Sequence, residues 1–436
     1  MKTTKVALIG FGTIGTGVAR LLLEHRDRMT RRSGRRVELA YVVDLDLTRD
    51  RGITLPEGLL SDNLDQVIAD EEVAVVVQLI GGLEPARSIM LRLLESGKDI
   101  VTANKALLAQ HGPELFARAR QLGRSIAFEA AVAGGIPIIA AIGQSLTANQ
   151  ITSLHAILNG TSNFILTEME EKGSDYSEVV AEAQRLGYAE ADPTMDVDGS
   201  DAAQKLAILA QLAFGASIHW RDIRRTGIDI VHVDDMRYAA ELGYTVRLLA
   251  VAQLSGEGLE LHVSPTLVRH DTLIADVRGA YNAIHVVGDA VGRVFFQGLG
   301  AGQDPTASAV VADLIDTIVG RTALTFKTLN LWGQGGNNGN APVVIRDQAD
   351  VTTRFYLRFT VDDRPGVMAE VTGILGQHRI SIASVMQHET SERNRGVVPL
   401  VIMTHNAKAG AMDEALEAIK KLKCVHPGAI CMRVHN

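Results

Sequence analysis

Two groups of residues in this chain of 436 residues have the types and the spacing that chemistry requires. The first is the glycine-rich turn G-F-G-T-I-G over residues 10–15, which follows an apolar run and precedes a helix-like stretch. Here glycine permits a tight turn, close approach of the backbone to a pyrophosphate, and close packing of helix on strand. The N-terminus of the helix attracts the phosphates. The pattern predicts a dinucleotide site made by Gly10, Gly12, Thr13, Ile14 and Gly15.

The second group lies in a helix predicted over residues 200–214. Past its N-cap the only polar side chains are Asp201, Gln204, Lys205 and Gln211, and a helix that is apolar nearly all round is buried. Asp201 and Lys205 share one face because they are four residues apart. Burial disfavours the charged form of a lysine, whereas a neighbouring carboxylate favours it. Lys205 is therefore predicted to exchange a proton with an alcohol or a carbonyl, oriented by Asp201.

The segment before this helix, residues 187–201, carries five carboxylates. Such a density is typical of a solvated loop, of a calcium site, or of a pocket for a cationic group. The spacing differs from that of an EF-hand, which argues against calcium. The buried helix that follows favours a pocket for a cationic group.

Two further positions are candidate ligands of the cofactor. Lys105 follows a strand predicted over residues 99–102, and the carboxyl ends of strands are where doubly wound folds bind ligands; a surface charge is the alternative. Asp44 ends the second predicted strand and can accept a hydrogen bond from the ribose 2′-hydroxyl of NAD. Arg49 or Arg51 can instead meet the 2′-phosphate of NADP, or can belong to a solvated loop.

Composition excludes several classes of protein. The net charge of −8 argues against general nucleic-acid binding, and 46% hydrophobic with 22% charged residues is typical of a globular chain. The only cysteines are Cys424 and Cys431, which suits a reducing compartment. The most apolar stretch, residues 130–142, is too short to span a membrane, and the start of the chain has no signal-peptide pattern. We expect a cytoplasmic protein that binds neither membranes nor nucleic acids.

The order of the predicted elements indicates an α/β fold in three parts. Strands over residues 6–9, 39–43, 73–79 and 99–102 alternate with helical patterns, which predicts a Rossmann-type doubly wound parallel sheet. From about residue 151 the pattern indicates an α+β domain for substrate binding and dimerisation, and a helix over residues 307–319 is expected to return to the first sheet. The last part has the order βαββαβ of a ferredoxin-like module. The predicted boundaries are 1–135 with 305–332, 136–304, a linker over 333–352, and 353–436.

With these features the chain resembles bacterial homoserine dehydrogenase with a C-terminal ACT domain. The resemblance implies NAD- or NADP-dependent interconversion of L-homoserine and L-aspartate 4-semialdehyde, in threonine, methionine and isoleucine biosynthesis. The ACT domain is expected to bind threonine, with a plain assembly module as the alternative, and the chain is expected to form a homodimer or homotetramer. The segments that carry the resemblance are residues 10–15, 79–82, 102–106, 128–137, 158–163, 187–205 and 305–309.

The resemblance also implies roles for individual residues. Lys205 becomes the proton-transferring lysine, Lys105 the second lysine of the active site, and Glu190 the ligand of the substrate amino group. Gly302 approaches the nicotinamide, although the bulkier Gln303 and Asp304 that follow depart from the family pattern. The remaining implied residues are Asp192, Asp196, Asp201 and Thr161 in the substrate pocket, and Glu129, Val132, Gly134 and Ile136 around a structural sodium ion.

Two other functions stay open at this point. One is a dinucleotide-binding regulatory protein without catalysis, and the other is a different amino-acid-pathway reductase, such as an aspartate-type dehydrogenase. The combination of Glu190 with Lys205 on a buried helix favours homoserine dehydrogenase. An assay of NAD(P)H formation from homoserine distinguishes the three.

Overall fold

The computed structural model describes residues 3–329, 331–332, 343–388 and 396–435. Two compact units are present, each built from three stretches of the chain. Unit 1 comprises Met1–Thr152, Ala203–Ile223 and Val286–Val343, and unit 2 comprises Ser153–Ala202, Arg224–His285 and Val344–Asn436. Residues 333–342 of the predicted linker lie outside the described residues.

Unit 1 contains a six-stranded sheet with the strand order β3-β2-β1-β4-β5-β6. Its recorded strand pairs are all parallel, which confirms the predicted Rossmann-type sheet. The strand order reverses between β1 and β4, and open α/β sheets bind ligands beyond the carboxyl ends of the strands at such a point. The strands are β1 (Thr3–Ile9), β2 (Arg36–Val43), β3 (Leu60–Ser61), β4 (Val73–Gln78), β5 (Asp99–Thr102) and β6 (Ile126–Ala127).

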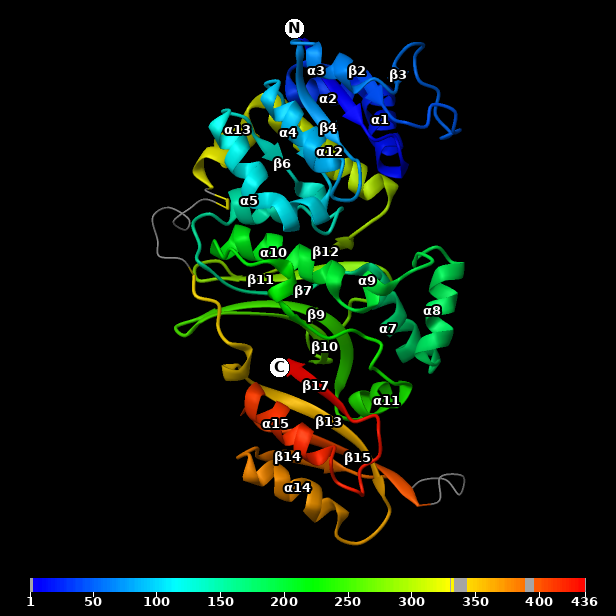
Figure 1. Cartoon of the computed structure of the whole chain (residues 1–436), viewed down its shortest axis with the longest axis vertical. Helices are drawn as coiled ribbons and strands as arrows, with labels where there is room; N and C mark the ends of the chain where they lie inside the picture. Colours follow the sequence, from blue (N-terminus) through cyan, green and yellow to red (C-terminus); the bar gives the residue numbers. More distant parts are fainter. Residues whose placement is uncertain (1–2, 330, 333–342, 389–395, 436) are drawn as a thin grey trace. The chain divides into compact units, whose positions relative to one another are not determined.

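Helices pack on this sheet, and one of them comes from late in the chain. The predicted helix over residues 307–319 is α12, which packs on α1 and contacts β4 and β5 (Figure 1). Its Ala307 and Val310 join Val6 and Val75 in one apolar core, which explains why this segment is almost free of charge on one side. The helices are α1 (Thr13–Glu24), α2 (Arg26–Ser33), α3 (Leu64–Ala69), α4 (Ala86–Glu95), α5 (Lys105–Gln121), α6 (Ile138–Ala140), α12 (Gln303–Val319) and α13 (Arg321–Thr328).

Unit 2 is built on a mostly antiparallel sheet with the strand order β7-β9-β10-β17-β13-β15-β14. The last strand of the chain, β17, lies between β10 and β13, and it pairs in parallel with β10 through Thr266–Val268 against Arg433–His435 (Figure 1). The strands are β7 (Ile151–Ile157), β8 (Arg224–Arg225), β9 (Tyr244–Ser255), β10 (Gly258–Arg269), β13 (Thr352–Asp362), β14 (Ile382–Met386), β15 (Val397–Thr404), β16 (Ala407–Lys408) and β17 (Ile430–His435), with β11 (Tyr281–Gly288) and β12 (Gly292–Leu299) elsewhere in the chain.

The C-terminal module has the predicted βαββαβ order, with the two-residue strand β16 added before its second helix. Phe359, Leu375 and Ile402 are in the core that its sheet and two helices share. The helices not yet named are α7 (Gly160–Lys172), α8 (Tyr176–Arg185), α9 (Thr194–Val197), α10 (Ser200–Phe214), α11 (Val233–Glu241), α14 (Val367–Gln377) and α15 (Ala409–Ile419). Among the described residues, no helix is both long and apolar enough to cross a membrane.

Candidate active site

The glycine turn between β1 and α1 has the geometry that a dinucleotide site needs. Gly10 has φ +93°, and a Cβ there would lie 2.9 Å from the carbonyl carbon of Leu79. A Cβ on Gly15 would lie 2.1 Å from the carbonyl oxygen of Gly10, whereas one on Gly12 would meet nothing within 4 Å. The first and third glycines are therefore required by the fold, and the second leaves open space beside the N-terminus of α1, where a pyrophosphate fits.

Asp44, at the end of β2, lies directly at this turn. One carboxylate oxygen accepts the N–H of Phe11 at 2.6 Å, and the other accepts the N–H of Asp46 at 2.9 Å. Arg51 also lies here: it donates to the carbonyls of Phe11, Arg49 and Asp46, and its Nη2 is 3.5 Å from the Asp44 carboxylate. The side chain of Arg51 is only 7% exposed and is packed into the turn, whereas Arg49 is exposed.

Lys105 is the first residue of α5 and follows β5 at the carboxyl edge of the sheet. Its neighbour Asn104 caps the helix by accepting the N–H of Leu107 at 3.0 Å. The amide of Asn104 also donates to the carbonyls of Ile80 and Gly82, at 3.0 and 2.7 Å. Asn104 thus ties the loop after β4 to the start of α5, and Lys105 is placed at the carboxyl ends of two adjacent strands.

Gly302 precedes α12 with φ +118°, a conformation that favours glycine. Gln303 donates to the carbonyl of Thr13 at 2.9 Å and accepts from Arg20 at 3.3 Å. Asp304 forms an ion pair with the same arginine. The two residues that depart from the family pattern therefore attach the start of α12 to α1 at Thr13 and Arg20.

In the acidic segment of unit 2, residues 187–201, only some of the carboxylates share a common partner. Asn159 donates to the carboxylate of Asp196 at 2.7 Å and to that of Asp201 at 2.8 Å. Asp192 instead accepts the N–H and the hydroxyl of Thr194, and these bonds lower the pKa of the Asp192 carboxyl. Glu190 is exposed, and within the described residues no hydrogen bond or ion pair engages its carboxylate.

The helix that carries Lys205 is buried, as the sequence predicts. In α10 the relative exposures are 3% for Asp201 and 8% for Lys205, and Gln204 and Gln211 are buried as well. Asp201 lies in the first turn of this helix, one turn before Lys205. A carboxylate and an amine thus lie one turn apart on a buried helix that has no other ionisable side chain, which is the setting for controlled proton transfer.

Thr161 lies in the first turn of α7, and its hydroxyl donates to the carbonyl of Tyr188 at 2.7 Å. This contact holds the start of the acidic segment against α7. A Cβ on Gly160 would lie 2.7 Å from the carbonyl oxygen of Ala280, so glycine is required where the loop before β11 crosses the helix.

The predicted sodium ligands lie in one loop of unit 1. The carboxylate of Glu129 accepts the N–H groups of Ile139 and Ala140, both at 2.8 Å, and burial raises its pKa to about 7. The carboxylate of Asp313 lies beside it and accepts the N–H of Glu129 at 2.7 Å. Carboxylate and carbonyl oxygens are the ligands that a hard cation prefers, but burial raises the pKa of both the Glu129 and the Asp313 carboxyl, which reduces the negative charge available to one. Among the described residues no cluster of three or more His, Cys, Asp or Glu side chains forms a metal site.

Known proteins match the whole chain. Family models match at residues 10–129 (homoserine dehydrogenase, NAD binding domain), 137–315 (homoserine dehydrogenase) and 355–424 (ACT domain). Homoserine dehydrogenase of Pseudomonas aeruginosa is 44% identical over 439 residues, and the match covers all of both chains. The chain belongs to the homoserine dehydrogenase family. It is accordingly an NAD(P)-binding oxidoreductase with a C-terminal ACT domain.

Solved structures of homoserine dehydrogenases share this architecture. That from Thiobacillus denitrificans is 43% identical with a TM-score of 0.91, covering 100% of this chain and 99% of the other. A hyperthermophilic archaeal homoserine dehydrogenase in complex with NADPH is 26% identical with a TM-score of 0.61, covering 72% and 97%.

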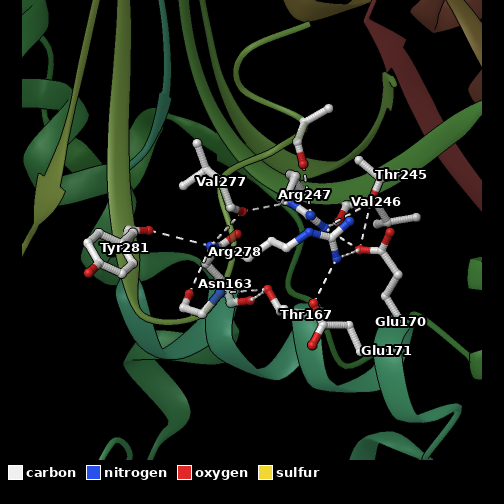
Figure 2. A network of polar contacts seen from close by, with 12 residues as sticks. Asn163, Thr167, Glu170, Glu171, Thr245, Val246, Arg247, Val277, Arg278 and Tyr281 are labelled. Atoms are coloured by element: carbon white, nitrogen blue, oxygen red, sulfur yellow. Dashed lines mark hydrogen bonds and ion pairs between the residues drawn. The ribbon is translucent and has the colours of Figure 1, made fainter. Parts of the chain in front are cut away.

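A buried polar network between β9, α7 and the loop before β11 was not predicted from the sequence. Arg247 of β9 is completely buried, and it pairs with Glu170 of α7 at 2.9 Å (Figure 2). Its guanidinium also donates to the carbonyls of Ala275 and Val277, and Asn163 of α7 donates to that of Val277. The network fixes the loop before β11 against α7. A single arginine within the apolar strand pattern of residues 244–252 is the signal that could have indicated it.

Proposed function

We propose that Lys205, Lys105 and Asp201 are the catalytic residues of this dehydrogenase. NAD(P), when bound, supplies the acceptor for the hydride that leaves C4 of homoserine. Lys205, as the neutral amine, accepts the proton of the C4 hydroxyl as the aldehyde forms, and it returns a proton in the reverse direction. Asp201 orients the amine, and Lys105 is the second lysine of the site. The observation that carries this proposal is that buried α10 has only two ionisable residues, Asp201 and Lys205.

The substrate ammonium group is proposed to bind the acidic segment. Glu190 is the main ligand, because its exposed carboxylate makes no competing bond within the described residues. Asp192 and Asp196 add negative charge, and Asp192 stays ionised because Thr194 lowers its pKa. Thr161 fixes the segment through the carbonyl of Tyr188. The semialdehyde product carries the same ammonium group, so one set of ligands serves both directions.

Both NAD and NADP are proposed as cofactors, held by the residues of the glycine turn together with Asp44, Lys105 and Gly302. Asp44 offers an acceptor for a ribose 2′-hydroxyl. Arg51 lies beside it and partly neutralises its charge, which supports acceptance of a 2′-phosphate as well. The structure of the hyperthermophilic archaeal homoserine dehydrogenase in complex with NADPH favours the same proposal.

Threonine is the proposed effector at the ACT domain. The turn after β13, from Asp363 to Val367, lines a cavity of about 410 Å³ with Met368, Gln387 and Leu400, which is large enough for an amino acid. Paired ACT modules imply a homodimer or homotetramer, and light scattering measures which one forms. An end product that inhibits this step would make it a control point of threonine, methionine and isoleucine biosynthesis.

A structural sodium ion is proposed at the carboxylate of Glu129 and the carbonyls of Val132, Gly134 and Ile136. The buried carboxylate of Glu129 beside Asp313 supports it. The thermal midpoint of the wild-type protein is expected to rise when choline chloride is replaced by sodium chloride, and that of Glu129→Gln is expected not to rise. An equal rise in both proteins would argue against this site.

The catalytic proposal is tested by replacing Lys205. Lys205→Ala is expected to lower kcat by about 100-fold or more, as loss of general acid–base catalysis does, with little change in the affinity for NADPH. Gln211→Ala, a buried polar change two turns later on α10, is the matched control for disturbed packing. Near-wild-type kcat in Lys205→Ala would remove this residue from proton transfer.

A further inference from the structure

The side chain of Asn159 occupies the junction between β7 and α7 and is 5% exposed. Its Oδ1 accepts the N–H of Ser162 at 2.7 Å, which caps α7. Its Nδ2 donates to the carboxylates of Asp196 at 2.7 Å and Asp201 at 2.8 Å. Because the oxygen is committed to the helix, the amide group has one orientation, with its N–H bonds toward the two carboxylates.

We propose that Asn159 is a positioning residue for the dehydrogenase reaction, whose amide holds the carboxylates of Asp196 and Asp201 in the arrangement that receives the substrate. The inference rests on the proposed substrate and catalytic roles of these two aspartates. Two carboxylates in one place repel each other, and hydrogen bonds from a shared donor favour the ionised form of both. The donor is neutral, so it organises the two negative charges without cancelling the attraction that an ammonium group needs.

Capping α7 does not explain the choice of asparagine. A cap needs only an oxygen, and serine, threonine or aspartate would supply it. The NH₂ group is used by the two carboxylates alone. Since Asp201 lies in the first turn of α10, fixing its carboxylate also fixes the N-terminal end of the helix on which Lys205 follows one turn later.

The platform behind Asn159 is rigid. The backbone of Gly160 lies against the carbonyl of Ala280, and Asn163 donates to the carbonyls of Val277, Gly279 and Tyr281 (Figure 2). These contacts anchor the N-terminal part of α7. An amide on a packed helix terminus can define the separation of two carboxylates, whereas an amide on a free loop cannot.

The decisive variant is Asn159→Asp, which keeps the size of the side chain and its capping oxygen. It replaces the NH₂ donor by an oxygen, so that a third carboxylate lies beside those of Asp196 and Asp201. We expect the KM for homoserine to rise by about tenfold or more, since charge-assisted hydrogen bonds are lost and repulsion is added, with the KM for NAD(P) within about twofold. Asn159→Ser, which keeps a capping oxygen and adds no charge, is expected to give a smaller rise in the same constant. An unchanged KM for homoserine in both variants would overturn the inference.

Asn63→Asp is the matched control, because it makes the same chemical change at another helix N-cap, where the side-chain oxygen accepts the N–H groups of Asp65 and Gln66. It is expected to leave the KM for homoserine within about twofold. If Asn63→Asp raises that KM as much as Asn159→Asp does, the effect does not come from the two carboxylates and the positioning role is refuted.

A double-mutant cycle separates this inference from the proposed function. In the double variant Asn159→Asp with Asp196→Asn, the amide is on residue 196 and the carboxylate on residue 159, so one hydrogen bond between them is restored in the opposite direction. The fold-decrease in kcat/KM of the double variant is therefore expected to be smaller than the product of the fold-decreases of the two single variants. If Asp196→Asn alone leaves the KM for homoserine unchanged, the substrate role of Asp196 fails. If that role holds and the two losses multiply, Asn159 does not position Asp196.

Discussion

The buried carboxylate of Asp235 accepts two hydrogen bonds from the guanidinium of Arg358, at 2.6 and 3.0 Å. Asp235 lies in the first turn of α11, and Arg358 lies on β13 of the ACT domain. The hydroxyl of Tyr356 adds a third bond to the same carboxylate at 2.8 Å. Together with the pairing of β10 and β17, this ion pair joins the ACT domain to the rest of unit 2 through buried contacts.

Removing one partner of this pair should be costly. Arg358→Met leaves the Asp235 carboxylate, which has no exposed surface, without its cation, and we expect the free energy of unfolding to fall by about 3–5 kcal/mol. Urea denaturation measures it. The exposed pair of Arg224 and Asp413 is the matched control, and Arg224→Met should cost about 1 kcal/mol or less. Equal losses in the two variants would show that burial of the pair is unimportant.

Binding of the substrate through its amino group is expected to depend on Glu190. A charge-assisted hydrogen bond is worth about 1.5–3 kcal/mol, so Glu190→Gln should raise the KM for homoserine by roughly 10- to 100-fold. Steady-state kinetics measure this, with Glu178→Gln on exposed α8 as the control. If the KM is unchanged in Glu190→Gln, the ammonium group is held by Asp192 or Asp196 instead.

The preference between cofactors should depend on Arg51. Arg51→Gln removes the cation beside Asp44, so the ratio of kcat/KM with NADP to that with NAD is expected to fall by about tenfold, the size of one charge-assisted contact. Arg49→Gln changes an exposed arginine in the same loop and should leave the ratio unaltered. A fall in both kcat/KM values without a change of their ratio would show that Arg51 only supports the turn.

Inhibition by threonine should depend on the turn that lines the ACT cavity. Gly366 has φ +93°, so Gly366→Ala strains that turn, and we expect inhibition to weaken while activity without threonine is kept. The full effect of threonine is expected to lie within the 5- to 150-fold range that is typical of allosteric coupling. Gly376→Ala, within α14 of the same module and with open space around it, is the control. If threonine inhibits both variants as it does the wild type, the effector binds elsewhere.

Acid should destabilise unit 2 through buried histidines. Burial and the neighbouring His435 lower the pKa of His155 to about 3, and burial lowers that of His262 to about 4. In the unfolded chain a histidine has a pKa near 6.5, so below that pH the unfolded state binds more protons, and the free energy of unfolding falls as the pH drops from about 6.5 toward 4.

His155→Phe should reduce the loss of stability at acid pH, because a phenyl ring does not bind a proton. A phenyl ring can replace the imidazole, since within the described residues the Nδ1 of His155 has no hydrogen-bond partner. Urea midpoints at about pH 7.5 and about pH 5 measure the difference. His270→Phe, at an exposed position, is the control. A midpoint difference in His155→Phe as large as in the wild type would exclude His155 as a source of the acid sensitivity.

Local features of this protein could be predicted from the sequence, and long-range contacts could not. The glycine turn and the buried helix with Asp201 and Lys205 depend on residues close together in the chain, where spacing alone carries the signal. The contacts of Asn159 join segments about 40 residues apart, as the separations of 37 and 42 residues show, and nothing in either segment indicates the other. The roles of the site residues and the domain boundaries stay predictions.

The place of β17 has a consequence for how the protein is made. Its neighbours in the sheet, β10 and β13, are complete long before it is synthesised, and β10 ends about 160 residues earlier in the chain. Until residues 430–435 leave the ribosome, both neighbours present unpaired edges, which in a nascent chain invite association with other strands. β10 and β13 can be joined in one sheet only after residues 430–435 have been made, so a chain truncated before β17 would keep the Asp235–Arg358 pair but leave the sheet divided at that point.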